Sequence, residues 1–360
     1  MREAWTGRCL HLMHAEKFIG PFVAFINERF ESREHLFLVR YSSGHAIPDA
    51  SNVQVFDRHP RRWGRWHKIW LLATRLNRAE KIFLHSLFHV DVMLVLLVMP
   101  WLLGKCHWLI WGADVYAYTL QRRGWRARVS ERVRASIIRR VGYLLTYIPG
   151  DVALARQWYG AGGDYRECLL YPSNVWQAPP SDISLQREVN SGRVLNIIVG
   201  NSADPANNHE DAFLRIQRVD NGSFRIYCPL SYGDKGYADR VAAIGRELFG
   251  DRFFPLVDFM SLDQYRSFLA SMDVAVFAHQ RQQGLGNMIQ LLGLGKIVFM
   301  RSTVTQYEMF RSLGVAVFDL DRLDISAEAT DIRAIGDNCQ KISDYFNIKN
   351  LERQYRRIFG

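Results

Sequence analysis

The sequence has few cysteines, and they form no recognisable pattern. The five cysteines of the 360-residue chain lie far apart, include no CxxC pair and are odd in number. Disulfide frameworks and structural zinc sites depend on closely or regularly spaced cysteines. The sequence therefore excludes a disulfide-rich scaffold and a cysteine-based zinc site, and a reducing cytoplasm is the expected compartment.

The sequence also lacks an apolar run long enough to cross a membrane. Residues 1–14 contain no apolar segment of the about 7–15 residues that a signal peptide needs. The most apolar stretch, residues 88–103, is about 16 residues long and includes His89, Asp91 and Pro100. A spanning helix needs about 20 apolar residues. We therefore expect a buried helix here, or one that dips into a membrane surface.

Acidic residues are scarce in two segments of the first half. The whole chain has 46 Lys and Arg against 36 Asp and Glu, a net charge of +10. Residues 58–81 and 121–140 contain 16 basic and 2 acidic residues, so they carry +14 and the rest of the chain −4. A basic surface favours nucleic acid, anionic lipid headgroups or phosphorylated ligands. No RNP, KH or zinc-finger signature occurs, which argues against nucleic acid.

The basic segments also contain tryptophans, and this combination is typical of proteins that bind a membrane surface. Each Lys or Arg near an anionic leaflet contributes about 1 kcal/mol. We predict peripheral binding to anionic inner-leaflet lipids, and a solvated charged face is the simpler alternative. The residues expected at the membrane are Arg61, Arg62, Arg65, Trp66, Arg122, Arg123, Trp125 and Arg126.

Short apolar runs alternate with segments of helical periodicity along most of the chain. This alternation predicts an α/β fold in which mostly parallel sheets are covered by helices on both faces. One core organises about 250–300 residues at most, so two domains are expected. The predicted boundaries are a first domain over residues 1–175, a linker over 176–193, a second domain over 194–330 and a helical segment over 331–360.

The predicted elements locate the candidate sites. Strands are expected over residues 9–13, 35–40, 52–56, 81–85, 106–111, 143–148, 167–171, 194–199, 224–228, 253–256, 274–279, 297–300 and 315–318. Helices are expected over residues 21–31, 89–103, 130–140, 151–159, 236–249, 262–271, 287–294, 305–313 and 331–359, with Ser261 as an N-cap. Parallel sheets bind ligands beyond the carboxyl ends of their strands, so the residues directly after strands are the candidates.

A first candidate segment follows the first strand of the second domain. Gly200, Asn201 and Ser202 come directly after the strand over 194–199. A glycine at such a point lets backbone N–H groups approach a phosphate, and the Asn and Ser side chains add donors. A plain turn is the alternative interpretation.

A second candidate segment is HQRQQGLGN, residues 279–287, between a strand and an apolar helix. Its hydrogen-bonding side chains, its two glycines and the helix N-terminus suit a diphosphate, with Arg281 as a bidentate donor. The sequence has neither a Walker A lysine motif nor the GxGxxG of hydride-transfer cofactor sites. The candidate residues are Arg281, Gln282, Gln283, Gly284, Gly286 and Asn287.

Three ionisable residues near strand ends of the first domain are candidates for acid–base chemistry. Asp114 follows the strand over 106–111 and could act as a general base or cap the helix that follows, and both interpretations stay open. His85 ends the strand over 81–85, and Glu16 follows the first strand. A lone histidine is more often structural than catalytic.

Four segments together resemble a known family. IWGADVY, IIVGNSADPANNHED, CPLSYG and RQQGLGNMIQLLGLG are similar, in this order, to the TDP-N-acetylfucosamine:lipid II N-acetylfucosaminyltransferases, glycosyltransferase family 56. The resemblance extends from about Cys9 to about Met309. The chain departs from the family pattern at residues 14–20 and 58–78, both on the acceptor side.

The resemblance implies a GT-B enzyme with two Rossmann-like domains that face each other across a cleft. It implies that the first domain faces a polyprenyl-diphosphate-linked acceptor and that the second binds a dTDP-linked sugar. It further implies a peripheral enzyme at the cytoplasmic face of the bacterial inner membrane. Such an enzyme transfers 4-acetamido-4,6-dideoxygalactose (Fuc4NAc) in the synthesis of enterobacterial common antigen or an O-antigen-like polysaccharide.

The expected mechanism needs a base near the acceptor hydroxyl and positive groups near the departing diphosphate. No DxD-like acidic cluster follows a strand, so we expect no metal and no other cofactor, with Arg281 and residues 284–287 stabilising the diphosphate. Asp114 or Glu16 is the expected base with His85 nearby, and Tyr232 joins the donor-binding residues. The alternative is a GT-B module that binds a nucleotide sugar or a glycan without catalysis.

Overall fold

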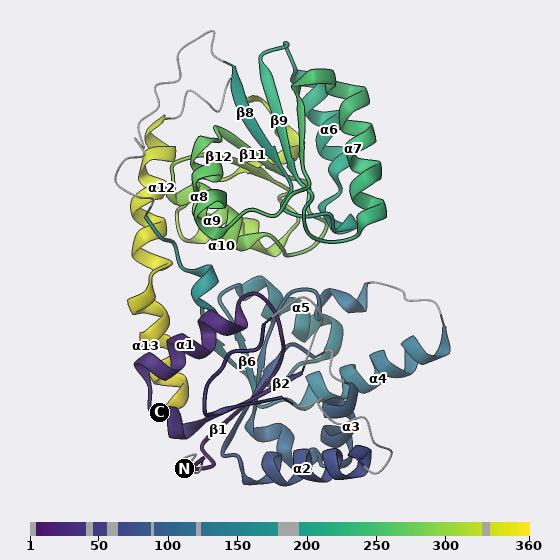
Figure 1. The fold of residues 1–360 in the computed structure, drawn as a ribbon, viewed down its shortest axis with the longest axis vertical. Helices are drawn as coiled ribbons and strands as arrows, with labels where there is room; N and C mark the ends of the chain where they lie inside the picture. The colour runs from purple at the N-terminus through teal and green to yellow at the C-terminus, as the bar shows by residue number, and fades with distance from the viewer. Residues whose placement is uncertain are drawn as a thin grey trace. The chain divides into compact units, whose positions relative to one another are not determined.

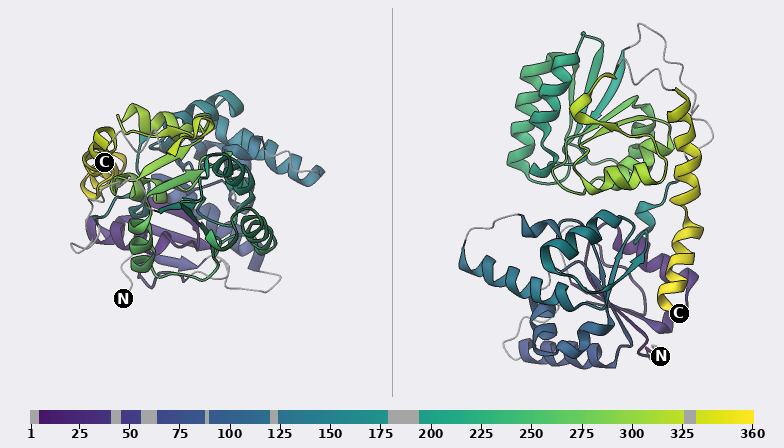
Figure 2. Two further views of the ribbon diagram at one scale, coloured as in Figure 1. Left: turned by 90° about the horizontal axis from the view of Figure 1, so that it is seen from above. Right: turned by 180° about the vertical axis from the view of Figure 1, so that it is seen from behind.

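The chain forms two compact units, each built on one parallel sheet (Figures 1 and 2). The first unit comprises Met1–Ser173 together with Ile348–Gly360, and the second comprises Asn174–Asn347. The computed structural model describes residues 5–40, 46–55, 64–87, 90–119, 124–178, 194–325 and 332–360.

The first unit contains a seven-stranded sheet in the order β3-β2-β1-β4-β5-β6-β7, and all its strand pairs are parallel. The order reverses direction between β1 and β4, where such sheets bind ligands. The strands are β1 (Cys9–His14), β2 (His35–Arg40), β3 (Val53–Val55), β4 (Lys81–His85), β5 (Cys106–Leu109), β6 (Tyr143–Thr146) and β7 (Asp164–Glu167).

Helices cover both faces of this sheet because side chains alternate between the faces along each strand. Leu10 and Leu12 pack in one core with residues of α2, α3, α4 and α5, whereas His11 contacts Phe22 of α1 and Phe359 of α13 on the other face. The helices are α1 (Ile19–Arg29), α2 (Gly64–Arg78), α3 (Val90–Val98), α4 (Trp125–Arg140), α5 (Pro149–Tyr159) and α13 (Ile348–Phe359).

The second unit contains a six-stranded parallel sheet in the order β10-β9-β8-β11-β12-β13, which reverses between β8 and β11. Its strands are β8 (Leu195–Val199), β9 (Phe224–Pro229), β10 (Phe253–Leu256), β11 (Val274–Phe277), β12 (Ile297–Met300) and β13 (Phe318–Asp319). Its helices are α6 (His209–Val219), α7 (Lys235–Phe249), α8 (Leu262–Ser271), α9 (Leu285–Gly293), α10 (Thr305–Ser312) and α12 (Ile332–Tyr345). Ser261 caps α8 in a capping box with Gln264, as predicted.

The predicted α/β class with parallel sheets is confirmed, but two strands were predicted with the wrong bounds. The strand expected over 315–318 is β13, Phe318–Asp319, and shares only Phe318 with the prediction. The strand expected over 167–171 lies earlier, at Asp164–Glu167, because this mostly exposed edge strand is polar and carries no hydrophobic signal. The apolar residues after it form a loop in which Leu170 has a φ of 68°. That loop is held by α13, whose Gln354 accepts a hydrogen bond from the Leu169 N–H at 2.8 Å.

The helix expected over 331–359 is two helices, α12 and α13, and only α12 belongs to the second unit. The α13 helix packs in the first unit, where the Tyr355 hydroxyl donates to the Leu170 carbonyl at 2.7 Å. Of the predicted linker, residues 176–193, the structure describes residues 176–178, and residues 179–193 lie outside the described residues. Within the described part of the chain, no helix is long and apolar enough to span a membrane.

Candidate active site

The two candidate segments of the second unit meet at the point where its strand order reverses. Residues 200–202 follow β8, and residues 279–287 follow β11, its neighbour in the sheet. A Cβ atom on Gly284 would lie 2.7 Å from Cε1 of His279 and 3.2 Å from Oδ1 of Asn201. The backbone of Gly284 has a φ of 71°, so glycine is the residue suited to this close approach. The structure therefore brings the predicted loops into direct contact.

Asn207 joins the two loops, although the sequence did not single it out. Its Oδ1 accepts hydrogen bonds from the Asn201 backbone N–H at 2.9 Å and from Nε2 of His279 at 3.0 Å. Its Nδ2 donates to the Ser202 hydroxyl at 3.3 Å. Because Asn207 is almost completely buried, one amide side chain connects the segments after β8 and β11.

Two further bonds attach the segment after β11 to residues 204–207. The Gln280 N–H donates to the Ala206 carbonyl at 3.0 Å, and Arg281 forms an ion pair with Asp204 at 2.8 Å. The Arg281 side chain is 19% exposed, and its other terminal nitrogen donates to the Gln282 carbonyl. Arg281 thus lies at the predicted site with part of its guanidinium already bound to a carboxylate.

Five buried side-chain atoms of this region have no hydrogen-bond partner within the described part of the chain. They are Oδ1 of Asn201, Nε2 of His209, Nδ1 of His279, Oε1 of Gln283 and Oε1 of Gln306. Buried polar atoms without partners are costly in a folded protein and concentrate where ligands bind. Burial lowers the pKa of His209 to about 4 and that of His279 to about 3, so both rings are neutral at physiological pH.

The N-terminus of α9 is better suited to an anion than those of the neighbouring helices. Its N-cap is Gly284, which makes no side-chain cap, and its first turn has no acidic residue. By contrast, α6 begins with Glu210 and Asp211, and α7 is capped by the carboxylate of Asp234. Since the partial positive charge of a helix N-terminus attracts anions, α9 offers the favourable position.

The remaining donor-side candidates lie beside this helix start or on the adjoining loop. Gly286 is in the first turn of α9, and Asn287 donates from Nδ2 to the Tyr265 hydroxyl at 2.7 Å. Tyr232 is 54% exposed, and its carbonyl accepts a hydrogen bond from the Ala203 N–H at 2.7 Å. That bond holds Tyr232 next to residues 200–202.

In the first unit, Asp114 lies in the interior and does not project from the sheet. Its Oδ2 accepts a hydrogen bond from Nε1 of Trp108 at 2.7 Å, and its Oδ1 accepts from the N–H groups of Trp111 and Val115 at 3.1 Å each. Burial raises the pKa of the Asp114 carboxyl to about 6. Asp114 could have been a general base or a cap, and this geometry fits a cap of the turn after β5.

His85 is also fully buried, within a chain of hydrogen-bonded rings. Its Nδ1 contacts the Tyr171 hydroxyl at 2.7 Å, and its Nε2 contacts Nδ1 of His11 at 3.2 Å. Trp111 donates from Nε1 to the same Tyr171 hydroxyl at 2.8 Å, and His11 continues the chain to His35 at 3.0 Å. Burial lowers the pKa of His85 to about 3, so it is neutral near pH 7.

Two other residues lie where the strand order of the first sheet reverses. Glu16 follows β1 and is half-buried, so it is the accessible carboxylate among the three candidates. Ser86 follows β4 with a φ of 75°, and its buried hydroxyl has no partner among the described residues. A non-glycine residue in this strained conformation is typical of functional sites. No sequence pattern distinguished Ser86.

The sequence over residues 27–356 matches the profile of the family described as 4-alpha-L-fucosyltransferase, glycosyl transferase group 56. The chain belongs to glycosyltransferase family 56. This membership confirms the family that the sequence motifs indicated, and it makes the protein a glycosyltransferase-family enzyme.

Solved structures show the fold of this family 56 chain to be GT-B. HepE from Anabaena, in complex with UDP and glucose, is 14% identical with a TM-score of 0.68, and the match covers 98% of each chain. Sucrose-phosphate synthase from Thermosynechococcus elongatus is 13% identical with a TM-score of 0.65, and the match covers 98% of this chain and 99% of that one. A glycosyltransferase from Rickettsia africae is 11% identical with a TM-score of 0.65, and the match covers 98% of this chain and 97% of that one.

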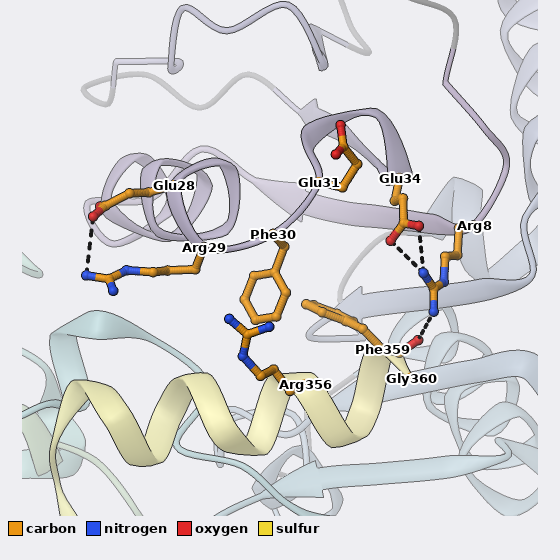
Figure 3. Close-up of a pocket in the computed structure, with 9 residues that line it drawn as sticks. All are labelled: Arg8, Glu28, Arg29, Phe30, Glu31, Glu34, Arg356, Phe359 and Gly360. Carbon is orange, nitrogen blue, oxygen red and sulfur yellow. Dashed lines mark hydrogen bonds and ion pairs between the residues drawn. The ribbon is translucent and has the colours of Figure 1, made fainter.

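A cavity of about 490 Å³ lies in the first unit of the family 56 chain, and none of the candidate residues lines it (Figure 3). Its lining includes Arg8 and Glu34, which precede β1 and β2 and therefore lie at the amino edge of the sheet. Arg8 binds Glu34 at 2.6 Å, and Arg356 lies over the ring of Phe30 at 5.4 Å. Arg8 and Glu34 are thus engaged with each other, at the sheet edge opposite to the ligand-binding edge of such folds.

The structure describes few of the side chains predicted at the membrane. Arg61, Arg62, Arg122 and Arg123 lie outside the described residues, as do the side chains of Arg65, Trp66 and Arg126. Trp125 is described, and 70% of its surface is exposed.

Proposed function

We propose that this family 56 enzyme transfers a Fuc4NAc-type sugar from a dTDP donor to a polyprenyl-diphosphate-linked oligosaccharide during bacterial surface polysaccharide synthesis. Family membership and the motif resemblance support the sugar and the acceptor. The observation that carries the donor side is the meeting of the β8 and β11 loops at the uncapped N-terminus of α9. HepE, a GT-B neighbour, is described in complex with UDP and glucose, which supports a nucleotide-sugar donor here.

In this proposal the donor diphosphate binds at the start of α9. The N–H groups of its first turn, with Gly286 and Asn287, are the donors for the phosphate oxygens. Arg281 contributes those guanidinium N–H groups that Asp204 does not occupy. These groups stabilise the negative charge that develops on the leaving nucleotide as the glycosidic bond breaks.

We assign the general base to Glu16. A base must reach the acceptor hydroxyl, and Glu16 is half-buried in the loop after β1, whereas Asp114 is fully buried with three hydrogen-bond donors. His85 is neutral and held by Tyr171 and His11, so its role is to support the sheet edge and not to transfer a proton. Glu16 would accept the hydroxyl proton as that oxygen attacks the sugar.

The acceptor is a lipid, so the enzyme is expected to work at a membrane surface. The basic segments of the first unit favour the anionic lipids of the cytoplasmic leaflet. Peripheral attachment at the cytoplasmic face of the inner membrane follows from this proposal.

A donor screen tests the proposed function. Purified protein is incubated with a polyprenyl-diphosphate disaccharide and a series of dTDP- and UDP-linked sugars, and products are separated by mass. We expect transfer from the dTDP-linked 4-acetamido-4,6-dideoxygalactose. Transfer from a UDP-sugar alone would overturn the donor assignment. Binding of nucleotide sugar without any product would favour a non-catalytic GT-B module.

A further inference from the structure

The outer surface of α2, α3 and α4 exposes an unusual number of large apolar side chains. On α3 and the 3-10 turn after it (Pro100–Lys105), Leu94, Leu97, Val98 and Trp101 are 45%, 38%, 75% and 64% exposed. Trp70 of α2 is 61% exposed, and on α4 Trp125 and Val129 are 70% and 49% exposed. We call these seven residues the apolar ridge. Exposed apolar patches of this kind mark surfaces that bind another apolar phase.

The three helices that carry these residues bury their other faces in one core. Leu76 of α2, Leu96 of α3 and Ile137 of α4 belong to the same cluster under the sheet, and α3 packs against both α2 and α4. Trp101 donates from Nε1 to Oδ1 of Asn77 at 3.0 Å, which fastens the turn after α3 to α2. Figures 1 and 2 show these three helices together on one side of the first sheet.

Apart from Asp91 in its first turn, which pairs with Arg40 at 3.9 Å, the α3 helix is apolar, yet only part of it is buried. Its inner residues Val92, Met93 and Leu96 are at most 5% exposed, whereas Val98 remains open. A helix that is apolar all round normally lies in a core or a membrane. With nine residues it is far too short to span a bilayer, so it fits a helix that lies in the plane of the membrane surface.

Cations flank the apolar ridge. On α4, Arg128 and Arg132 are exposed on the same helical face as Trp125 and Val129, since these positions are three, four and seven residues apart. The single acidic residue of α4, Glu131, is bound by Arg134 and by the Tyr159 hydroxyl. Exposed aliphatic side chains, tryptophans and arginines together are the side chains that suit one leaflet, from acyl chains to phosphates.

We infer that the apolar ridge inserts into the headgroup region of an anionic bilayer, with α3 parallel to the membrane plane. This deepens the proposed function, which needs a lipid-borne acceptor but does not require side chains to enter the bilayer. A second copy of the chain fits this surface less well, because a two-fold contact would place the basic faces of two α4 helices against each other. The bilayer satisfies both the apolar and the cationic groups.

Flotation of the full chain with vesicles tests this inference. Wild-type protein should float with vesicles that contain phosphatidylglycerol, and less with pure phosphatidylcholine. The double variant Val98→Ser/Trp101→Ser removes two exposed apolar groups and should weaken binding to the anionic vesicles by about tenfold or more. High salt should weaken wild-type binding without abolishing it, because insertion is not screened. Phe259→Ser is the matched control: Phe259 is 89% exposed in the second unit and should not affect flotation.

Equal flotation of the double variant and the wild type would overturn the inference, as would absence of wild-type flotation. A change of oligomeric state in the double variant, with vesicle binding unchanged, would assign the ridge to a second copy instead. Sugar transfer to a short, water-soluble acceptor analogue, assayed without vesicles, distinguishes a failure of the proposed function from a failure of the membrane-insertion inference. Absence of transfer by the wild type in that assay would count against the proposed function, whereas the double variant should match the wild type there.

Discussion

The two sheets share one strand order up to the sixth strand but present different chemistry where that order reverses. At the β8/β11 edge, neutral amides and imidazoles surround an uncapped helix N-terminus, and several buried acceptors lack partners within the described residues. At the β1/β4 edge, the buried histidines are bound to one another and to Tyr171. The buried carboxylate of Asp114, after the neighbouring strand β5, is bound by Trp108 and by two backbone N–H groups. The same topology thus offers a candidate anion site in one unit and, in the other, Glu16 as the accessible carboxylate among the acid–base candidates.

The largest expected effect tests the role proposed for Glu16 at the β1/β4 edge. Glu16→Gln should lower kcat by about 10²- to 10⁴-fold, because it removes the proposed general base while keeping the shape of the side chain. The donor KM should stay within a few-fold of wild type, since the proposed donor site is in the second unit. Steady-state kinetics with the dTDP donor measures both. Full activity of Glu16→Gln would exclude Glu16 as the base.

Asp114, in the turn after β5, allows a second test of the first unit, through pH. Its pKa is raised from 3.8 to about 6 in the folded protein, so the native state holds this proton more tightly than the unfolded chain. Its contribution to the free energy of unfolding therefore falls as pH rises from about 4 to about 6, by about 2–3 kcal/mol. Asp114→Asn lacks this titration.

Denaturant unfolding of the wild type and Asp114→Asn at several pH values measures the effect. The advantage of the wild type over the variant should shrink by that amount between pH 4 and pH 7. A difference that is constant with pH would contradict the buried environment of Asp114. Loss of kcat in a stably folded Asp114→Asn protein would return the base role to this residue.

On the second edge, Arg281→Ala should raise the donor KM by about 10- to 100-fold, because a hydrogen bond to a charged group contributes about 1.5–3 kcal/mol. Arg246→Ala is the control, since Arg246 is an exposed arginine in the last turn of α7, far along the chain from these loops. Titration with dTDP-sugar measures the affinity. If Arg281→Ala leaves both donor affinity and turnover unchanged, the diphosphate assignment fails.

The smallest expected effect concerns Asn207. Asn207→Ala leaves the Asn201 N–H and Nε2 of His279 without their common acceptor, which should lower the free energy of unfolding by about 1–3 kcal/mol. The donor KM should also rise, because the loops after β8 and β11 lose their connection. Thermal unfolding with and without dTDP reports both effects. A variant with wild-type stability and wild-type dTDP binding would show that this amide does not organise the site.

Strand positions were predictable where the strand is buried, because a buried strand is a run of apolar residues. The strand over 297–300 and the helix over 262–271 were predicted with the bounds that the structure has. The edge strand β7 was missed because its residues are polar and exposed. The basic helix α2 was not predicted either, because its arginines and tryptophans interrupt the helical period of its apolar residues.

The positions of the candidate donor loops were predictable for a similar reason, since their glycines and amides lie directly after apolar strands. Asn207 and Ser86 were not predictable from the sequence. Asn207 stands out only through its hydrogen-bond partners on two loops, and Ser86 only through its backbone conformation. The choice between base and cap for Asp114 also needed the structure. Only tertiary burial, and the three donors it brings to that carboxylate, separates the two roles.

The sequence by itself determined the parallel α/β class, the family and the uneven distribution of charge, because local period, motif order and composition are properties of the chain alone. The tertiary structure decided which candidate side chains meet and which are enclosed. It also placed α13 in the first unit and showed α3 to be half-exposed. These features depend on contacts between residues far apart in the chain, which no local pattern encodes.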